Sequence, residues 1–331
     1  MYKELFRKCI IPLLTLALGF LVGFCIARGK VESTATAIPS DDELELREVG
    51  GNYEFINPLL SCDTFENVSN RELKDIKQTI VSYAEQATKD AKATHISVYF
   101  RDLNNGPWFG LNEKDLFLPG SLLKVPFMIA LFKVAEGDPS FLSQRIQYTG
   151  GHVDFSEYFK PDRFLEENQI YTVDELISRM IVYSDNDATL LLQELVPREV
   201  IETTYRDLGI EIPKSNEYVM TVRTYASFFR ILYNGTYLTK AFSEKALALL
   251  GETTFVKGMR SVLPGQVVVS SKFGERENSL GKQLHDCGIV YYPKHPYLLC
   301  MMVRGDNFDD LSKVIAAVSR LVYTGIHSSG E

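Results

Sequence analysis

The spacing of apolar and polar residues predicts a folded domain that begins near residue 70. Apolar side chains recur on one face of a helix over residues 71–89. Apolar and polar residues then alternate over 95–100, as in a half-buried strand, and a second strand pattern covers 108–111. The Asn104-Asn105-Gly106 segment between them is a strong turn signal. These patterns predict a helix followed by a β-hairpin.

Further strand patterns occur only near the end of the domain. Residues 139–255 hold several helical patterns and few strand signals. Residues 275–282 are charged and contain glycine, which is typical of a loop. Strands at both ends with helices between them predict an α+β fold: an antiparallel five-stranded sheet flanked by helices, with an inserted helical subdomain over about 137–255. The late strand patterns lie at 270–273, 288–292 and 297–303, and a closing helix pattern at 309–322.

The beginning of the chain has the pattern of a membrane segment. Residues 9–27 are uncharged and would span about 28 Å as a helix, close to the thickness of a bilayer core. Three basic residues within 1–8 favour a cytoplasmic tail there. We therefore predict a single-pass signal-anchor in the cell membrane, with the domain periplasmic or extracellular. A cleavable signal peptide ending near Ala35-Thr36-Ala37 is the alternative.

A linker is predicted between this segment and the domain. Residues 31–45 are rich in Ser, Thr, Ala and acidic residues, which suits a disordered tether. We predict a linker over 28–68 and the domain over 69–331, with residues 53–60 apolar enough to dock on the domain. The sequence does not indicate an oligomeric state.

The negative charge of the chain bears on whether its partner is a nucleic acid. The formal charge is −8, and the first 30 residues carry +4, so the remainder carries −12. Nucleic-acid binding needs a basic surface, so we predict no nucleic-acid partner.

Two cysteines flank a predicted hairpin loop. Cys287 and Cys300 lie on either side of Pro293-Lys294-His295-Pro296, and strand pairing can bring them onto one face of the sheet. An exported protein allows a disulfide there. Two buried free thiols are the other interpretation, which we favour at this point.

Three short strings stand in a fixed order within the domain. They are Ser121-Leu122-Leu123-Lys124, Ser184-Asp185-Asn186 and Lys272-Phe273-Gly274. The first string alone has little weight, because Ser279-Leu280-Gly281-Lys282 also fits it by chance. Ser121 follows Leu118-Pro119-Gly120 and opens an apolar helical run, whereas Ser279 lies in the predicted loop. Ser121 is therefore the candidate nucleophile.

Ser121 and Lys124 have the chemistry of an activated nucleophile. Positions i and i+3 share one face of a helix, so the lysine amine can lie beside the serine hydroxyl. A serine hydroxyl is a weak nucleophile until a base takes its proton, and lysine acts as a base when burial or a nearby cation lowers its pKa. Lys272 is a candidate for that cation. Pro126 is tolerated only in the first turn of a helix, which independently places the helix start near Ser121.

The three strings together resemble, with one departure, the S-x-x-K, S-D-N and K-T-G set of class A β-lactamases and penicillin-recognising serine hydrolases. The resemblance covers about residues 70–325 and implies the β-lactamase/transpeptidase-like fold. It also implies that Ser121 attacks a lactam or peptide carbonyl, that Lys124 takes its proton, and that Ser184 relays a proton to the leaving nitrogen. By the same resemblance, Lys272 anchors the site electrostatically and Asn186 hydrogen-bonds the substrate's amide side chain. The N–H groups of Ser121 and Glu275 would form the oxyanion hole, and substrate would lie against the strand at Gly274.

Two departures limit what this resemblance implies. Phe273 replaces the threonine of K-T-G, whose hydroxyl helps hold the substrate carboxylate in the family. Arg276 is a candidate substitute, or else it pairs with Glu275 or Glu277. The family's E-x-x-L-N string, whose acid activates the deacylating water, does not occur, and Glu217 is the candidate for that acid. Without such an acid the acyl-enzyme would be long-lived, as in a penicillin-binding peptidase.

Each string also has a purely structural interpretation. Ser121 can be a helix N-cap, and Ser184-Asp185-Asn186 can form a turn and cap before a helix over 188–195. Lys272 can be an ordinary lysine at a strand edge. The order and spacing of the three strings favour the catalytic interpretation. His285-Asp286 suggests a Ser-His-Asp triad, but the chain has neither a G-x-S-x-G string nor an H-E-x-x-H string. We predict no metal and no cofactor.

The sequence therefore leads to one favoured function and two alternatives. We favour a class A-like serine hydrolase that opens β-lactam amides through an acyl-serine. The alternatives are a D,D-peptidase or transpeptidase acting on peptidoglycan stem peptides, and a membrane-tethered penicillin-binding sensor without turnover. The predicted partner is a small β-lactam or a peptidoglycan peptide.

Overall fold

The computed structural model describes residues 53–59, 71–104, 106–151, 157–161, 163–212, 218–279 and 281–329. The predicted cytoplasmic tail, the predicted signal-anchor, most of the predicted linker and Glu217 lie outside these residues. No helix within the described part of the chain is long and apolar enough to cross a membrane. The signal-anchor and the membrane location remain predictions.

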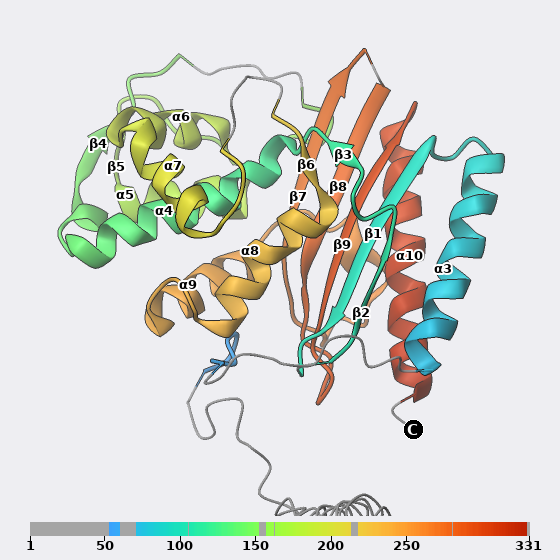
Figure 1. Cartoon of the computed structure of the whole chain (residues 1–331). Helices are drawn as coiled ribbons and strands as arrows, with labels where there is room; N and C mark the ends of the chain where they lie inside the picture. Colours follow the sequence, from blue (N-terminus) through green and yellow to red (C-terminus); the bar gives the residue numbers. More distant parts are fainter. Residues whose placement is uncertain are drawn as a thin grey trace, which may run out of the picture. The chain divides into compact units, whose positions relative to one another are not determined.

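A five-stranded antiparallel sheet forms the centre of the domain, in the order β2-β1-β9-β8-β7 (Figure 1). This arrangement confirms the predicted α+β class and the number of strands. The central strand β9 is buried on both faces, which explains its nearly unbroken apolar sequence. The strands are β1 His95–Asp102, β2 Trp108–Leu111, β7 Val269–Asn278, β8 Gly281–Val290 and β9 Tyr297–Gly305.

The hairpin between β7 and β8 differs from the prediction. Residues 275–282 are not a loop, because both strands continue through them until Asn278 lies opposite Gly281. β7 is an edge strand, and an edge strand can carry charged side chains that face solvent. Arg276 is therefore a strand residue, and Ser279 occupies the tight turn.

Two helices from opposite ends of the domain cover one face of the sheet (Figure 1). α3, Arg71–Lys89, packs beside α10, Phe308–Ser329, and their buried side chains join one apolar cluster with the sheet. Ile80 of α3 and Val314 and Val318 of α10 are fully buried. The opposite faces of both helices are polar, as the amphipathic patterns predicted.

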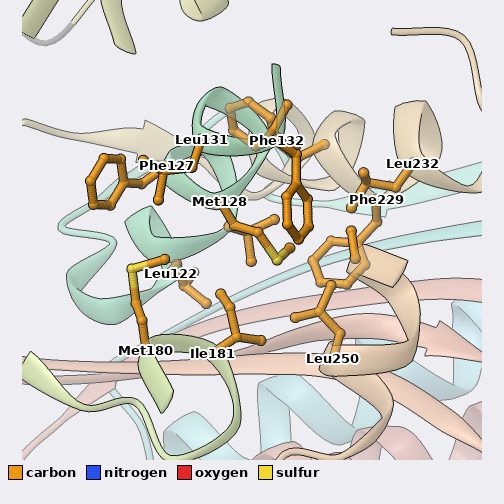
Figure 2. Close-up of a cluster of buried hydrophobic side chains, with 14 of the residues drawn as sticks. Leu122, Phe127, Met128, Leu131, Phe132, Met180, Ile181, Phe229, Leu232 and Leu250 are labelled. Atoms are coloured by element: carbon orange, nitrogen blue, oxygen red, sulfur yellow. The ribbon is translucent and has the colours of Figure 1, made fainter. Parts of the chain in front are cut away.

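The helical block covers the other face of the sheet and has its own apolar cluster (Figure 2). α4, Lys124–Gly137, runs through this cluster and is buried on nearly every side. Its Met128 lies among side chains of α5 and α8, such as Ile181 and Phe229. An apolar sequence on all faces of a helix is typical of such a central position. The remaining helices of the block are α5 Val173–Val182, α6 Asn186–Leu195, α7 Arg198–Asp207, α8 Val222–Asn234 and α9 Lys240–Gly251.

Two short two-stranded ribbons lie outside the main sheet. β3, Leu116–Phe117, pairs with β6, Met220–Thr221, and β4, Arg145–Gln147, pairs with β5, Ile170–Thr172. The β3–β6 ribbon lies directly before Ser121, so it helps to fix the entry to α4.

Residues 53–59 pack against the helical block. The Glu244 carboxylate on α9 accepts hydrogen bonds from the backbone N–H groups of Glu54, Phe55 and Ile56, at 2.6–3.1 Å. The Ile56 side chain is buried in the same apolar cluster as α4. This part of the predicted linker therefore belongs to the folded domain.

Cys287 of β8 and Cys300 of β9 form a disulfide across the two strands. The two residues are direct partners in the strand register, and both are buried. The interpretation as two free thiols, which the sequence favoured, is therefore wrong. Antiparallel partners present their side chains on the same face of the sheet, and this register is not visible in the spacing of the cysteines along the chain.

Candidate active site

Ser121 lies in a turn that is pressed against strand β7. A 3₁₀ turn, Gly120–Leu123, leads directly into α4. Gly120 has φ +55°, and a Cβ at this position would lie 2.3 Å from the Glu275 carbonyl oxygen. Glycine is required here because the conformation is left-handed and the two backbones are in close contact. The close approach brings the residue before Ser121 against the backbone of Glu275, and an oxyanion hole made by the N–H groups of Ser121 and Glu275 remains a prediction.

Gly274 makes the same contact from the strand side. A Cβ at Gly274 would lie 2.5 Å from the Pro119 carbonyl oxygen and 2.9 Å from the backbone nitrogen of Leu122. The missing side chain therefore makes room for the turn that holds Ser121, and not for a substrate on the other side of the strand. A role of Gly274 in substrate binding, through its backbone, remains a prediction.

Lys124 is the first residue of α4 and is almost completely buried, with 5% of its surface exposed. Its Nζ donates to the Ser184 carbonyl oxygen at 2.5 Å, to Ser184 Oγ at 3.2 Å and to Asn186 Oδ1 at 2.7 Å. Burial lowers the pKa of Lys124 to about 8, although Glu157 and Asp185 act in the opposite direction. An amine with this pKa can serve as a general base near neutral pH.

The Ser184-Asp185-Asn186 string is both a turn with a cap and part of the site. Ser184 has φ +58°, an uncommon conformation for a residue other than glycine. The Asp185 side chain caps α6 by accepting a hydrogen bond from the N–H of Ala188 at 3.0 Å. The sharp turn and the cap direct the Ser184 hydroxyl and the Asn186 amide toward Lys124. Backbone strain of this kind is commonly found at functional sites.

Lys272 reaches the same hydroxyl from the sheet. It is fully buried in the middle of β7, and its Nζ donates to Ser184 Oγ at 2.9 Å and to the Phe273 carbonyl oxygen at 3.0 Å. Burial, followed by the positive charge of Lys124, lowers the pKa of Lys272 well below its ordinary value. Lysines from the first and third strings thus converge on the serine of the second.

Some of these residues line a cleft of about 580 Å³ between the helical block and β7, whereas Ser184 and Lys272 are buried and do not line it. Ser121, Lys124 and Asn186 line one side of the cleft, and Glu275 and Arg276 the other. The cleft is also lined by Glu157, Tyr158, Glu277 and Phe308.

Glu157 is a site residue that the sequence reasoning missed. Its Oε1 accepts a hydrogen bond from Asn186 Nδ2 at 2.7 Å. The Asn186 side chain is therefore held at both ends, by Glu157 and by Lys124. Glu157 belongs to no recognisable string, and only the fold brings it next to the catalytic strings, so no signal in the sequence points to it.

Residues 157–159, which we call the strap, contact both sides of the cleft. At one end, Glu157 binds Asn186. At the other, the N–H of Phe159 donates to Glu275 Oε1 at 3.1 Å. The Tyr158 hydroxyl donates to Asp309 Oδ2 at 2.7 Å.

Phe273, the departure from K-T-G, packs in an aromatic cluster with the strap. Its ring stacks on Phe255 with centroids 4.1 Å apart, and the ring of Phe159 meets Phe273 edge-on at 6.3 Å. The ring also lies against Lys272, whose Nζ is 4.4 Å from the ring centroid. Position 273 therefore offers an apolar ring where the family has a hydroxyl.

Glu275 contributes an acidic side chain as well as a backbone N–H group. Burial raises the pKa of its carboxyl to about 7, and the negative charge of Glu157 acts in the same direction, whereas the hydrogen bond from Phe159 opposes the shift. The neighbouring Arg276 forms no ion pair with Glu275 or Glu277, because Glu277 pairs with Lys282 instead at 3.1 Å. Arg276 is exposed at the edge of the cleft, where a role in holding a carboxylate remains a prediction.

His285 and Asp286 do not form a triad with Ser121. His285 is buried in β8, and its Nε2 lies 2.9 Å from the carbonyl oxygen of Leu118, which helps to position the Ser121 turn. The Asp286 carboxylate accepts a hydrogen bond from the N–H of Met259 at 2.7 Å. Within the described residues, no group of three or more histidine, cysteine or acidic side chains is arranged to hold a metal ion.

The fold and the convergence of the three strings define the class of β-lactamase-like serine hydrolases. The model of the Beta-lactamase enzyme family matches residues 75–326, which is most of the chain. The chain belongs to the Beta-lactamase enzyme family.

Individual relatives are distant. A β-lactamase of Streptomyces lavendulae is 25% identical over 236 residues, which cover 66% of this chain and 76% of that protein. A variant of the last common ancestor of class A β-lactamases of Gram-negative bacteria has a TM-score of 0.66 at 24% identity, over 76% of this chain and 99% of that one. PBP-A has a TM-score of 0.64 at 21% identity, over 77% of this chain and 97% of that one. At these identities the solved structures show a shared fold and leave the activity open.

Proposed function

We propose that this protein hydrolyses β-lactam amides through an acyl-enzyme on Ser121. The observation that carries the proposal is the convergence of Lys124 and Lys272 on Ser184 Oγ, at 3.2 and 2.9 Å, with Lys124 lining the same cleft as Ser121. This arrangement supplies a nucleophile, a base of lowered pKa and a hydroxyl that can pass a proton.

The proposed reaction has two steps. Ser121 Oγ bonds to the carbonyl carbon as Lys124 takes the hydroxyl proton, and the carbonyl oxygen becomes an oxyanion that the N–H groups of Ser121 and Glu275 bind. The C–N bond then breaks, and the leaving nitrogen receives the proton of the Ser184 hydroxyl, which Lys124 or Lys272 replaces. Water next attacks the ester, releases the acid and restores Ser121.

A penicillin-binding peptidase without rapid turnover is the second candidate. Among the described residues, the hydrogen bonds of Lys124 go to Ser184 and Asn186 and not to a carboxylate that could activate water. PBP-A has a similar fold, and a variant of it that is 20% identical to this chain has a solved structure as an acyl-enzyme complex with penicillin G. The peptidase proposal shares the acylation step and differs only in the second one.

Intact-protein mass after mixing the full chain with benzylpenicillin tests both candidates. We expect an adduct with the mass of penicillin to form and then to disappear while penicillin is consumed. A lasting adduct would favour the peptidase or a sensor. No adduct over the range of pH 6 to 9 would contradict both.

The place of the protein in the cell is part of the proposal. The uncharged run at 9–27 supports a single-pass anchor with the domain outside the cytoplasm. Fractionation of cells that express the full chain, followed by protease treatment of intact spheroplasts, tests it. A protected domain, or a chain recovered in the soluble cytosol, would overturn this location.

A further inference from the structure

The hydrogen bonds of Asn186 raise a question about substrate recognition. Asn186 Oδ1 accepts from Lys124 Nζ at 2.7 Å, and Asn186 Nδ2 donates to Glu157 Oε1 at 2.7 Å. A substrate carbonyl that needs the Nδ2 donor must therefore displace a carboxylate of the protein. A substrate group that carries its own donor, such as an ammonium, can instead bind Glu157 directly.

The charge of Glu157 acts through the whole reactive part of the cleft. For Lys124 and Lys272, burial lowers the pKa and the charge of Glu157 raises it. For Glu275, burial and the charge of Glu157 both raise the pKa. Because the Glu157 carboxylate lies on Asn186 in the cleft, a substrate group bound near Asn186 would meet this negative charge, which repels a carboxylate and attracts an ammonium. Asp185 has the same sign near Lys124, and Arg276 at the cleft edge has the opposite sign.

The opposite side of the cleft supplies an independent observation. Phe273 points its ring into the cluster with Phe255 and Phe159, so this position offers no hydroxyl to a carboxylate. Glu275 Oε1 is held by the N–H of Phe159, and its Oε2 is buried without a hydrogen-bond partner. Above its pKa of about 7 the Glu275 side chain is an anion, so a substrate carboxylate near it would meet a like charge, and position 273 gives that carboxylate no hydroxyl.

We propose that Glu157 is a specificity-determining residue, which makes the cleft discriminate against acyl donors that carry a carboxylate and favour donors that carry an ammonium group. This inference rests on the proposed acylation of Ser121. It adds the charge class of the substrate, which the three catalytic strings do not determine.

Glu157→Gln tests the inference, because glutamine keeps an oxygen that can accept from Asn186 Nδ2 and removes only the charge. The probes are benzylpenicillin, an anion, and its methyl ester, which is neutral. Intact-protein mass gives the acylation rate constant for each. We expect the ratio of the anion's rate to the ester's rate to rise about tenfold in Glu157→Gln. The same variant should lower the rate for a penicillin with an ammonium group on its side chain, relative to the ester.

Glu277→Gln is the matched control. Glu277 also lines the cleft and is also acidic, but its side chain is 62% exposed and pairs with Lys282. Solvent screens such a charge, so the ratio should stay within about twofold of the unmodified protein. An unchanged ratio in Glu157→Gln, or an equal change in Glu277→Gln, would overturn the inference.

A second measurement separates this inference from the proposed function. Equilibrium binding of the same two probes to Ser121→Ala, with and without Glu157→Gln, involves no acylation. If the unmodified protein is never acylated, the proposed function fails, and the ratio of the two dissociation constants still decides the role of Glu157. A ratio that moves about tenfold toward the anion supports the charge preference, and a ratio that does not move contradicts it.

Discussion

The two ends of the cleft differ in how they relate to the catalytic strings. The reaction end, which comprises Ser121, Lys124, Ser184 and Lys272, is made of the residues that the strings contain, and its hydrogen bonds converge on one hydroxyl. The recognition end comprises Glu157 and Glu275, which line the cleft, and the buried rings of Phe159 and Phe273; it holds the departure from the K-T-G string and the residue that no string contains.

This difference teaches that the chemistry and the choice of substrate are separate properties of the fold. Bond breaking needs a nucleophile, a base and a proton relay in one geometry, so few changes are tolerated at the reaction end. The recognition end needs only a shape and a charge that fit the substrate, and a loop such as the strap can supply both. The chain can therefore retain acyl-transfer chemistry while its substrate differs from that of its relatives.

Removing the nucleophile breaks the reaction end completely. Ser121→Ala should abolish the covalent adduct with benzylpenicillin, because Ser121 carries the one hydroxyl of the Gly120–Leu123 turn, and we expect the Ser184 hydroxyl to relay a proton and not to attack. Intact-protein mass measures the adduct. Ser279→Ala is the matched control, since Ser279 stands in a similar string but occupies the exposed turn between β7 and β8. Normal labelling of Ser121→Ala would show that the nucleophile is elsewhere.

The base at the reaction end should give acylation a defined pH dependence. With a pKa of about 8, Lys124 is mainly protonated at pH 7 and mainly neutral at pH 9. Only the neutral amine accepts the Ser121 proton, so the acylation rate should rise about tenfold over this range. Rates from a pH series of mass measurements test this. Glu157→Gln should move the rise to lower pH, because the charge of Glu157 raises the pKa of Lys124. A rate independent of pH would exclude Lys124 as the base.

The contact between the Ser121 turn and β7 joins the two ends of the cleft. Gly274→Ala would place a methyl group 2.5 Å from the Pro119 carbonyl oxygen and force the turn and the strand apart. We expect a loss of about 1–3 kcal/mol in the free energy of unfolding, together with slower acylation. Denaturant unfolding and mass kinetics measure the two effects. Gly265→Ala is the control, since a Cβ there meets no atom within 4 Å. Full activity of a stable Gly274→Ala protein would refute this packing role.

The smallest change in stability is expected for the segment 53–59, which belongs to neither end of the cleft. Glu244→Gln weakens the hydrogen bonds from the N–H groups of Glu54, Phe55 and Ile56 by removing the negative charge of the acceptor. We expect about 1 kcal/mol lower stability and faster hydrogen exchange of these three amides, with acylation unchanged. Glu252→Gln, at an exposed position that ends α9, is the control. Unchanged exchange would mean that the carboxylate does not hold the segment.

Much of the fold was predictable because its elements have strong local patterns. The amphipathic patterns at 71–89 and 309–322 and the turn at Asn104-Asn105-Gly106 led to the right elements, since each is determined by neighbouring residues. The extension of β7 and β8 through 275–282 was missed because edge strands with charged side chains resemble loops in sequence. The Cys287–Cys300 disulfide depends on register between strands, which local patterns do not determine.

The candidate site was predictable only where its residues belong to strings. The residues that converge in the structure, Lys124, Ser184 and Lys272, were predicted because they stand in strings that resemble those of the family. Glu157 was not predicted, because the segment around it has no recognisable sequence pattern and only the fold brings its side chain to Asn186. The contact between Gly274 and the Ser121 turn was not predicted, since the side on which a strand meets its neighbours is a property of the packed structure.

The most direct test of the central claim, that the reaction end performs acyl transfer, is to locate the labelled residue. The full chain is mixed with benzylpenicillin and, separately, with its methyl ester at pH 8, quenched in acid, digested, and mapped by tandem mass spectrometry. We predict a single acylated peptide with the modification on Ser121 in at least one of the two reactions. A modification at any other residue, or no modification with either probe, would contradict the account.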